Sequence, residues 1–328
     1  MQRTNEEYIL TISNDDIYNY KRLDHYLCQQ LPDFSRTFIK NLFLNNLITM
    51  KNNSGEILKV ELKKMPKAIG TISIQIPPPI PIEAQAENIP LDIIYEDEHL
   101  LFVNKKAGIV THPAPGNYTG TLVNALLYYC NDLKSINNRI RPGIVHRLDK
   151  GTSGIMVVAK DQKTYEGLVL LFSSHDIDRV YEAIIIGNKV PTSGTLRGKI
   201  GRHKVHRTKM AINPVNGKDS ITHYKVLNYY EKFTHMELKL ETGRTHQIRV
   251  HLSSLLKHAI LNDPTYGNPN EHLKRIGNIY RPILNEYEYP LLHARLLGLI
   301  HPITKKKLLF EVPPPNEFQE VIKMAKLQ

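Results

Sequence analysis

Apolar residues recur at helical spacing near the start of the chain, which predicts a small helical module. Residues 23–31 carry leucine and tyrosine at this spacing, and residues 38–43 repeat it with phenylalanine, isoleucine and leucine. Ser35 stands where an N-cap would begin the second helix. Residues 53–55, Asn-Ser-Gly, mark a turn between two short strands. We therefore expect a helix–helix–hairpin module over residues 21–63.

A proline-rich stretch follows this module. Residues 76–81 read IPPPIP, and the polar segment IEAQAENIP comes directly after. Successive prolines favour an extended chain and cannot continue a helix or a central strand. We expect a linker at 76–90 that joins a domain of residues 1–75 to a larger domain of residues 91–328. The alternative is an extended edge segment within one domain.

Strand-like runs predominate after the linker. They read LDIIYED, HLLFVNK, SGIMVVAK, RVYEAIIIG, THYKVLNYY and HMELKLE, and the last alternates apolar with polar residues. Helical patterns occur at 122–129, at 165–173 and around 245–256. Because strands follow strands without a regular strand–helix–strand rhythm, the expected fold class is α+β with a mostly antiparallel sheet.

Composition adds a preference for a polyanionic partner. The 328 residues include 43 Lys+Arg and 32 Asp+Glu, a formal charge of +11. Such an excess favours phosphate binding, and Arg36 and Lys40 on one helix face could contact RNA or could simply be solvated. Cys28 and Cys130 fit no ligand spacing and are expected as reduced thiols. No apolar run approaches the ~20 residues that span a bilayer, so we expect a cytoplasmic protein without a membrane partner.

The segment at 141–160, RPGIVHRLDKGTSGIMVVAK, is the first with candidate chemistry. A charged, glycine-containing loop runs into a strand that reads as buried. Asp149 stands in this loop among His146, Arg147 and Lys150. Nearby positive charge keeps a carboxylate ionised, which suits a nucleophile or a general base near neutral pH.

A basic segment at 194–210 is the second. It reads GTLRGKIGRHKVHRTKM and contains no acidic residue. Its six cationic side chains are Arg197, Lys199, Arg202, Lys204, Arg207 and Lys209. The three glycines favour a mobile arm that grips a phosphate backbone, although a solvated face explains the charges equally well.

The third segment is 240–252, LETGRTHQIRVHL. Arg244 follows a strand end and could pair with a carboxylate through two hydrogen bonds. His246 and His251 lie on different faces of the expected helix and lack a third ligand, so we expect no metal. Nucleotide-binding glycine motifs and the G-x-S-x-G motif are also missing from the sequence, which disfavours nucleotide hydrolysis and dinucleotide redox chemistry.

These segments resemble the RluA family of pseudouridine synthases. The matching residues spread over about 91–312, and they are Leu91–Asp97, Asn104-Lys105, Thr111–Gly116, Gly120–Asn124, His146–Lys150 with Thr152–Gly154, Arg179–Ala183, Ile200–His203 and Gly243–His251. The N-terminal module resembles the αL RNA-binding motif found in the RluC/RluD-type branch of the family, which modifies large-subunit ribosomal RNA. Within that branch, the stretch Thr111–Gly116 and Ile200–His203 resemble the RluD type more.

The resemblance implies roles for individual residues. Asp149 matches the family's catalytic aspartate, Tyr181 matches a tyrosine that contacts the target base, and Arg244 matches the arginine that pairs with the aspartate. Arg147 would fill the gap left by the extruded base. With these we group Arg36, Lys40, Arg202, Lys204 and Arg207 as expected RNA contacts.

The implied function is conversion of uridine to pseudouridine in RNA, most readily large-subunit ribosomal RNA, by a monomer without a cofactor. A uridine in a stem must be flipped into a pocket before its glycosidic bond can be cleaved. Asp149 could then attack the nucleoside or remove a ribose proton, and both routes stay open. Alternatives are a synthase acting on transfer RNA and an RNA-binding or ribosome-assembly protein without activity. A nuclease is disfavoured because the carboxylates of a two-metal site are missing.

Overall fold

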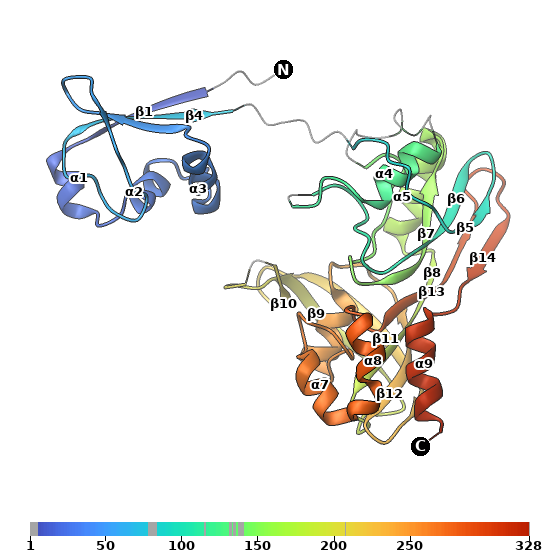
Figure 1. Ribbon diagram of the computed structural model, residues 1–328. Helices are drawn as coiled ribbons and strands as arrows, with labels where there is room; N and C mark the ends of the chain where they lie inside the picture. Colours follow the sequence, from blue (N-terminus) through green and yellow to red (C-terminus); the bar gives the residue numbers. More distant parts are fainter. Residues whose placement is uncertain are drawn as a thin grey trace. The chain divides into compact units, whose positions relative to one another are not determined.

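The computed structural model describes residues 6–77, 84–114, 116–130, 133, 136, 141–206 and 208–327. The chain divides into two compact units, Met1–Pro81 and Ile82–Gln328 (Figure 1). The division lies within the predicted linker. Residues 78–83, which include most of its prolines, are outside the described residues.

The first unit packs three helices against a four-stranded sheet. The helices are α1 (Asn14–Asn19), α2 (Leu23–Gln30) and α3 (Arg36–Leu44), and the strand order is β1 (Glu6–Ile12), β4 (Gly70–Ile76), β2 (Ile48–Lys51), β3 (Ile57–Leu58). The hydroxyl of Ser35 accepts a hydrogen bond from the amide of Phe38 at 3.2 Å, so the predicted cap begins α3. The predicted helices and hairpin are present, and the pairing of β1 with β4 adds two strands that the sequence pattern did not predict.

The second half of the predicted linker belongs to the second unit. Ala84 is buried in its core. The carbonyl of Gln85 accepts a hydrogen bond from the Asn124 amide at 2.6 Å, and the amide of Glu87 donates to the Asn124 carbonyl at 2.9 Å. Residues 84–90 are therefore not a free connection, because the larger unit satisfies their backbone groups.

A ten-stranded mixed sheet organises the second unit. The order is β10 (Met210–Ile212), β9 (Ser193–Arg202), β11 (Lys218–Tyr229), β12 (Phe233–Leu240), β8 (Asp178–Ile186), β13 (Leu292–Ile300), β7 (Ser153–Ala159), β6 (Leu100–Lys105) and β5 (Ile93–Glu96), with β14 (Lys307–Glu311) also on β13. Among the described strands, β13 and β7 alone pair in parallel. The predicted α+β class with a mostly antiparallel sheet is confirmed.

Helices cover this sheet at both ends (Figure 1). They are α4 (Leu122–Tyr129), α5 (Gln162–Ser174), α6 (Gln247–Val250), the π-helix η2 (His251–Leu255), α7 (Pro269–Ile276), the 3₁₀-helix η3 (Asn278–Tyr280), α8 (Arg281–Glu286) and α9 (Asn316–Ala325). Helices α4 and α5 pack on opposite faces of β6 and β7: Leu126 contacts the cluster that contains Val103, and Leu168 the cluster that contains Phe102. Helices α7, α8 and α9 pack over β8 and β12. The helix predicted around 245–256 is present as α6 followed by η2.

One glycine lets two central strands meet. Gly154 has φ 119°, and a Cβ there would lie 2.2 Å from the carbonyl oxygen of Ala294. No other residue type adopts this backbone without strain. The close approach of β7 to β13 fixes the start of β7, and the loop that carries Asp149 directly precedes it.

None of the helices in the described part of the chain is long and apolar enough to cross a membrane.

Candidate active site

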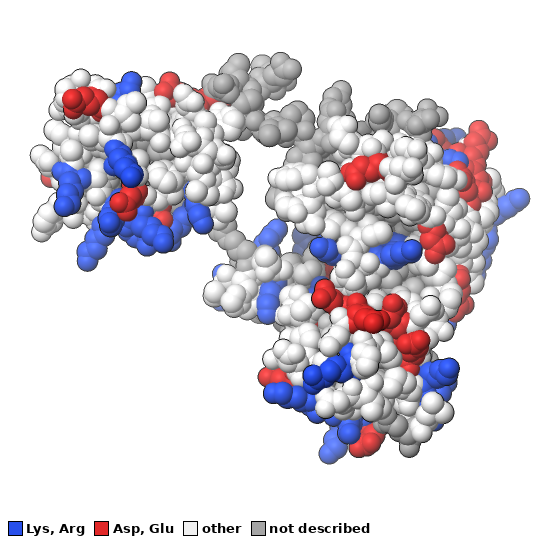
Figure 2. Space-filling model, viewed as in Figure 1, with Lys and Arg blue, Asp and Glu red and all other residues white. Residues whose placement is uncertain are grey.

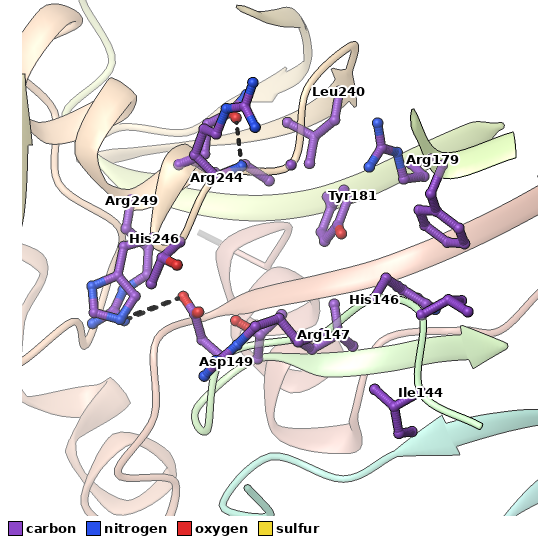
Figure 3. A pocket seen from close by; sticks show the side chains of 18 of the residues that line it. Ile144, His146, Arg147, Asp149, Arg179, Tyr181, Leu240, Arg244, His246 and Arg249 are labelled. Atoms are coloured by element: carbon purple, nitrogen blue, oxygen red, sulfur yellow. Dashed lines mark hydrogen bonds and ion pairs between the residues drawn. The ribbon is translucent and has the colours of Figure 1, made fainter. Parts of the chain in front are cut away.

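A cleft of about 540 Å³ brings together three segments of the second unit (Figure 3). They are the loop before β7, the first half of β8 and the turn into α6. The lining residues include Ile144, His146, Arg147, Asp149, Arg179, Tyr181, Leu240, Arg244, His246 and Arg249. Two of the three segments singled out in the sequence therefore meet at one site, together with Tyr181.

Strand β8 delivers two side chains to this cleft. Tyr181 lies between β12 and β13, opposite Leu238 and Ala294. Because side chains alternate along a strand, Arg179 faces the same side as Tyr181. Burial raises the pKa of Tyr181 to about 12, so the phenol stays protonated at neutral pH.

Buried polar groups form hydrogen bonds around the loop that carries Asp149. The hydroxyl of Thr111 donates to the Leu148 carbonyl at 3.0 Å. The ammonium group of Lys105, which is 2% exposed, donates to the carbonyls of Lys106 and Ile109 at 3.0 and 2.9 Å. Lys105 Nζ also lies 3.5 Å from the Lys150 carbonyl, which accepts a hydrogen bond from the amide of Gly108 at 2.8 Å. The residues on both sides of Asp149 are therefore hydrogen-bonded to the segment 105–111.

The basic side chains closest to Asp149 come from α6 and the residue before it. Its Oδ2 lies 3.5 Å from Nη1 of Arg249 and 3.9 Å from Nε2 of His246. Figure 3 shows these two residues on one side of Asp149, and Tyr181 with Arg179 on the other. The side chain of Asp149 is 15% exposed, so solvent screens this ion pair only partly.

A second carboxylate fixes the orientation of Arg249. Its Nε and Nη2 donate to the two oxygens of Asp263 at 2.7 and 2.8 Å. Asp263 is fully buried; burial alone would raise its pKa, but hydrogen bonds and charge from Arg249 lower the pKa below its ordinary value. The Arg249 guanidinium also lies over the ring of Tyr266, 5.0 Å from its centroid. With two nitrogens occupied, the third is directed at Asp149.

Arg244 is not the partner of Asp149, and the predicted pairing is wrong. Its Nε donates to the carbonyl of Asp219 on β11 at 3.0 Å. Both arginines line the cleft, but Arg244 precedes α6, whereas Arg249 lies within α6 and is buried. A sequence signal existed, because an arginine flanked by apolar helix positions requires a buried carboxylate partner.

His146 does not supply the positive charge that its position suggested. Its Nε2 accepts a hydrogen bond from the amide of Val157 at 3.0 Å, and its ring stacks on Phe172. Burial lowers its pKa to about 3, so the ring is neutral. His146 therefore supports the cleft wall, and the cation beside Asp149 is Arg249.

The predicted RNA contacts outside the cleft are spread over both units. Arg36 is exposed but binds the buried Asp24 at 2.7 Å, while Lys40 is exposed on α3. Figure 2 shows several Lys and Arg side chains on the visible face of the first unit. Arg202 and Lys204 are exposed in the second unit, and Arg207 lies outside the described residues. These assignments stay predictions.

The segment expected to be a glycine-hinged arm is mostly an ordered strand. Residues 193–202 form β9, which pairs with β11 along most of its length. Its glycines mark close packing: a Cβ at Gly194 would lie 2.8 Å from the ring of Tyr224. Only the turn to β10 remains as a loop. We call β9, this turn and β10 the basic hairpin.

His251 is structural, and no group that could hold a metal occurs among the described residues. Its two ring nitrogens lie 2.8 and 2.9 Å from the hydroxyls of Ser220 and Thr222 on β11. Four residues near Asp149 were missed in the sequence as site residues: Arg249, Asp263, Tyr266 and His246, the last considered only as a metal ligand. Two of them, His246 and Arg249, lie at the start of α6 and within it, and the other two lie in one short turn, 263–268, that no sequence pattern connects to Asp149.

The sequence and the fold match one family of RNA-modifying enzymes. The chain matches the model of RNA pseudouridylate synthases over residues 99–254. A solved structure of human RNA pseudouridylate synthase domain containing 4 superposes with a TM-score of 0.55 at 25% identity, over 72% of this chain and 93% of that one. The human domain containing 1 protein gives 0.53 at 22% identity, covering 76% and 98%, and supports the fold alone.

The chain belongs to the pseudouridine synthase family, as its similarity to curated relatives shows. It is 41% identical over 307 residues to ribosomal large subunit pseudouridine synthase D of Zymomonas mobilis, covering 92% of this chain and 93% of that one. The Escherichia coli K12 protein of the same name is 38% identical over 308 residues, covering 93% and 91%. The predicted family is confirmed: the chain is an isomerase that acts on uridine in RNA.

Proposed function

We propose that this enzyme converts specific uridines of large-subunit ribosomal RNA to pseudouridine, with Asp149 as the reacting carboxylate. The observation that carries the proposal is the position of Asp149 in the cleft, 3.5 Å from Arg249 and next to Leu148, whose carbonyl is bound by Thr111. The relatives named for this RNA match the chain over almost its whole length, which supports the substrate class.

The cleft suits a flipped nucleotide. A uridine within a stem must leave the helix before its glycosidic bond becomes accessible, and the cleft is large enough for one base and ribose. Arg249 pairs with the Asp149 carboxylate, which can attack the nucleoside or take a ribose proton. Tyr181, on the opposite side, would contact the uracil ring. The uracil stays bound and is neither oxidised nor reduced, so the reaction itself demands no cofactor.

Several cations would bind the RNA around this cleft. Arg147, Arg179 and Arg244 line it and can neutralise the phosphates beside the flipped nucleotide. The basic hairpin would add RNA contacts through Arg202, Lys204 and Arg207, and the first unit would separately bind RNA through Arg36 and Lys40. We further propose that the enzyme acts as a monomer in the cytoplasm, where ribosomal RNA is modified.

An assay on defined RNAs tests this function. Enzyme is incubated with transcripts of large-subunit RNA, small-subunit RNA and transfer RNA that carry tritium at uridine carbon five, and tritium release is measured. We expect release from the large-subunit transcript, and none from it with Asp149→Asn, which still binds RNA. Tritium release from transfer RNA alone would favour a synthase that acts on transfer RNA. RNA binding without tritium release would favour an inactive ribosome-assembly protein.

A further inference from the structure

The hydroxyl of Tyr266 joins the basic hairpin to the catalytic cleft. It accepts a hydrogen bond from the amide of Met210 at 2.8 Å and lies 2.8 Å from Nδ1 of His246. The other ring nitrogen of His246 faces Oδ2 of Asp149 at 3.9 Å. Three consecutive contacts therefore connect the first residue of β10 to the carboxylate.

RNA bound to the basic hairpin would act on the backbone around Met210. In the antiparallel pairing of β10 with β9, Met210 lies directly opposite Arg202. The amide of His203 donates to the carbonyl of Lys209 at 3.0 Å and closes the turn that carries Lys204. A phosphate held by Arg202 or Lys204 would thus act on the same few residues whose backbone holds Tyr266.

The direction of the hydrogen bonds selects one tautomer of His246. Because the Tyr266 oxygen accepts from Met210, its own proton is available to donate to Nδ1 of His246. His246 then carries its proton on Nε2, which faces the negative charge of Asp149. The opposite tautomer would direct a lone pair at the carboxylate. Burial lowers the pKa of His246 below its ordinary value and raises that of Tyr266 to about 12, so both donors remain neutral near pH 7.

The backbone of His246 also requires support from its surroundings. It has φ 55°, a left-handed conformation that residues other than glycine seldom adopt. The ring of Tyr266 meets the His246 ring edge-on at 5.6 Å and lies beneath the Arg249 guanidinium. Tyr266 therefore contacts both side chains that flank Asp149.

We propose that Tyr266 is a positioning residue that couples RNA binding at the basic hairpin to the alignment of His246 and Asp149. RNA on the hairpin holds β10 in place, the Met210 amide holds the hydroxyl, and the hydroxyl keeps Nε2 of His246 directed at Asp149. The hairpin then contributes to the rate of the bound complex as well as to affinity. This inference rests on the proposed function.

Tyr266→Phe removes the hydroxyl and keeps the ring over Arg249. The matched control is Tyr229→Phe, which removes a hydroxyl that donates to the Val190 carbonyl at 2.8 Å outside the cleft. With enzyme in saturating excess over a large-subunit transcript, we expect Tyr266→Phe to slow the single-turnover rate by about tenfold to hundredfold, as small misplacements do. Its affinity for RNA should stay within about twofold, as for the control. An unchanged rate, or lost affinity at an unchanged rate, would overturn the coupling.

A double-mutant cycle tests the connection to the hairpin. Arg202→Ala combined with Lys204→Ala should lower both affinity and saturating rate in the wild-type background. In the Tyr266→Phe background the same pair should lower affinity but no longer the rate, because the connection is already cut. Rate losses that simply multiply would mean that hairpin and hydroxyl act independently, and the inference would fail.

The tautomer gives a measurement that does not depend on activity. With nitrogen-15 in the histidines, the His246 ring should show a protonated Nε2 in wild type and a mixture of tautomers in Tyr266→Phe. RNA should shift these signals in wild type and not in the variant. Identical spectra for wild type and Tyr266→Phe would contradict the coupling, even if the wild type is active. A wild type that makes no pseudouridine on any RNA, with the spectra as expected, would instead refute the proposed function.

Discussion

Arg249 holds two carboxylates at once: its Nη1 lies 3.5 Å from Asp149, while Nε and Nη2 bind the buried Asp263 at 2.7 and 2.8 Å. The longer contact, with Asp149, is partly exposed to solvent, whereas the two shorter bonds to Asp263 are buried. Asp263 thus fixes the guanidinium, and the cleft carboxylate receives a cation whose position does not depend on substrate.

We expect substitutions at Arg249 and Arg244 to have different effects. Arg249→Lys keeps a positive charge but cannot bind Asp263 with two parallel bonds, so the saturating rate should fall about hundredfold. Arg244→Lys keeps its charge at the cleft lining and should change that rate less than about tenfold. Single-turnover rates at saturating enzyme measure both.

Stability provides the control for this pair. Arg249→Leu leaves Asp263 buried without a cation and should cost about 3–5 kcal/mol of the free energy of unfolding. Arg244→Leu loses one bond to a backbone carbonyl and should cost about 1 kcal/mol. Equal losses for the two variants, in rate and in stability, would contradict the assignment of Arg249 as the partner.

The pair of Asp263 and Arg249 should also make stability depend on acid pH. The pKa of Asp263 is lowered in the folded state, so its contribution is complete above the unfolded pKa of about 3.9 and is lost as the pH falls through the folded value. Asp263→Asn cannot titrate. The difference in unfolding free energy between wild type and this variant should therefore shrink with acidification, whereas exposed Asp219→Asn should follow wild type.

Removal of the first unit tests where the catalytic unit begins. Deleting residues 1–83 keeps the bonds of Gln85 and Glu87 to Asn124, and deleting 1–90 removes them. We expect the shorter deletion to fold with weaker and less salt-dependent RNA binding, because phosphate contacts are lost. The melting temperature of the longer deletion should be lower by about 2–4 °C for each kcal/mol of unfolding free energy that the lost contacts contribute. Equal melting temperatures would mean that 84–90 is a free linker.

Local patterns in the sequence predict most elements but not the pairings between distant ones. The alternation at 235–241 and the cap at Ser35 are local, and both elements are present as β12 and α3. Strand β1 pairs with β4 across some sixty residues, and most of its side chains are exposed or half-buried, so its alternation is weak. The packing of 84–90 likewise depends on α4, which no local signal connects to it.

In the site, too, the sequence predicts what local motifs carry but not the contacts between distant residues. Asp149 and Tyr181 are carried by motifs, so the sequence places both in one site. Two arginines occur in the same short motif, at 244 and 249, and only the three-dimensional direction of each side chain decides which one reaches Asp149. Asp263 and Tyr266 act through side-chain direction across a turn, which spacing along the chain does not encode.

Tyr181 gives a prediction about the alkaline limit of activity. A tyrosine in water ionises near pH 10, but burial raises the pKa of Tyr181 to about 12. Arg179 opposes this shift and Asp149 adds to it, so Arg179→Met should raise the pKa further. The phenol thus remains a neutral donor throughout the usual assay range.

Single-turnover rates against pH, compared between wild type and Tyr181→Phe, test this directly. The variant should be slower at every pH because it lacks the hydroxyl, but the shapes of the two profiles should agree up to about pH 10. A decline of the wild-type rate between about pH 9 and 10 that Tyr181→Phe does not share would show that the phenol ionises there. The phenol would then be better solvated in the working enzyme than its burial in the cleft wall implies.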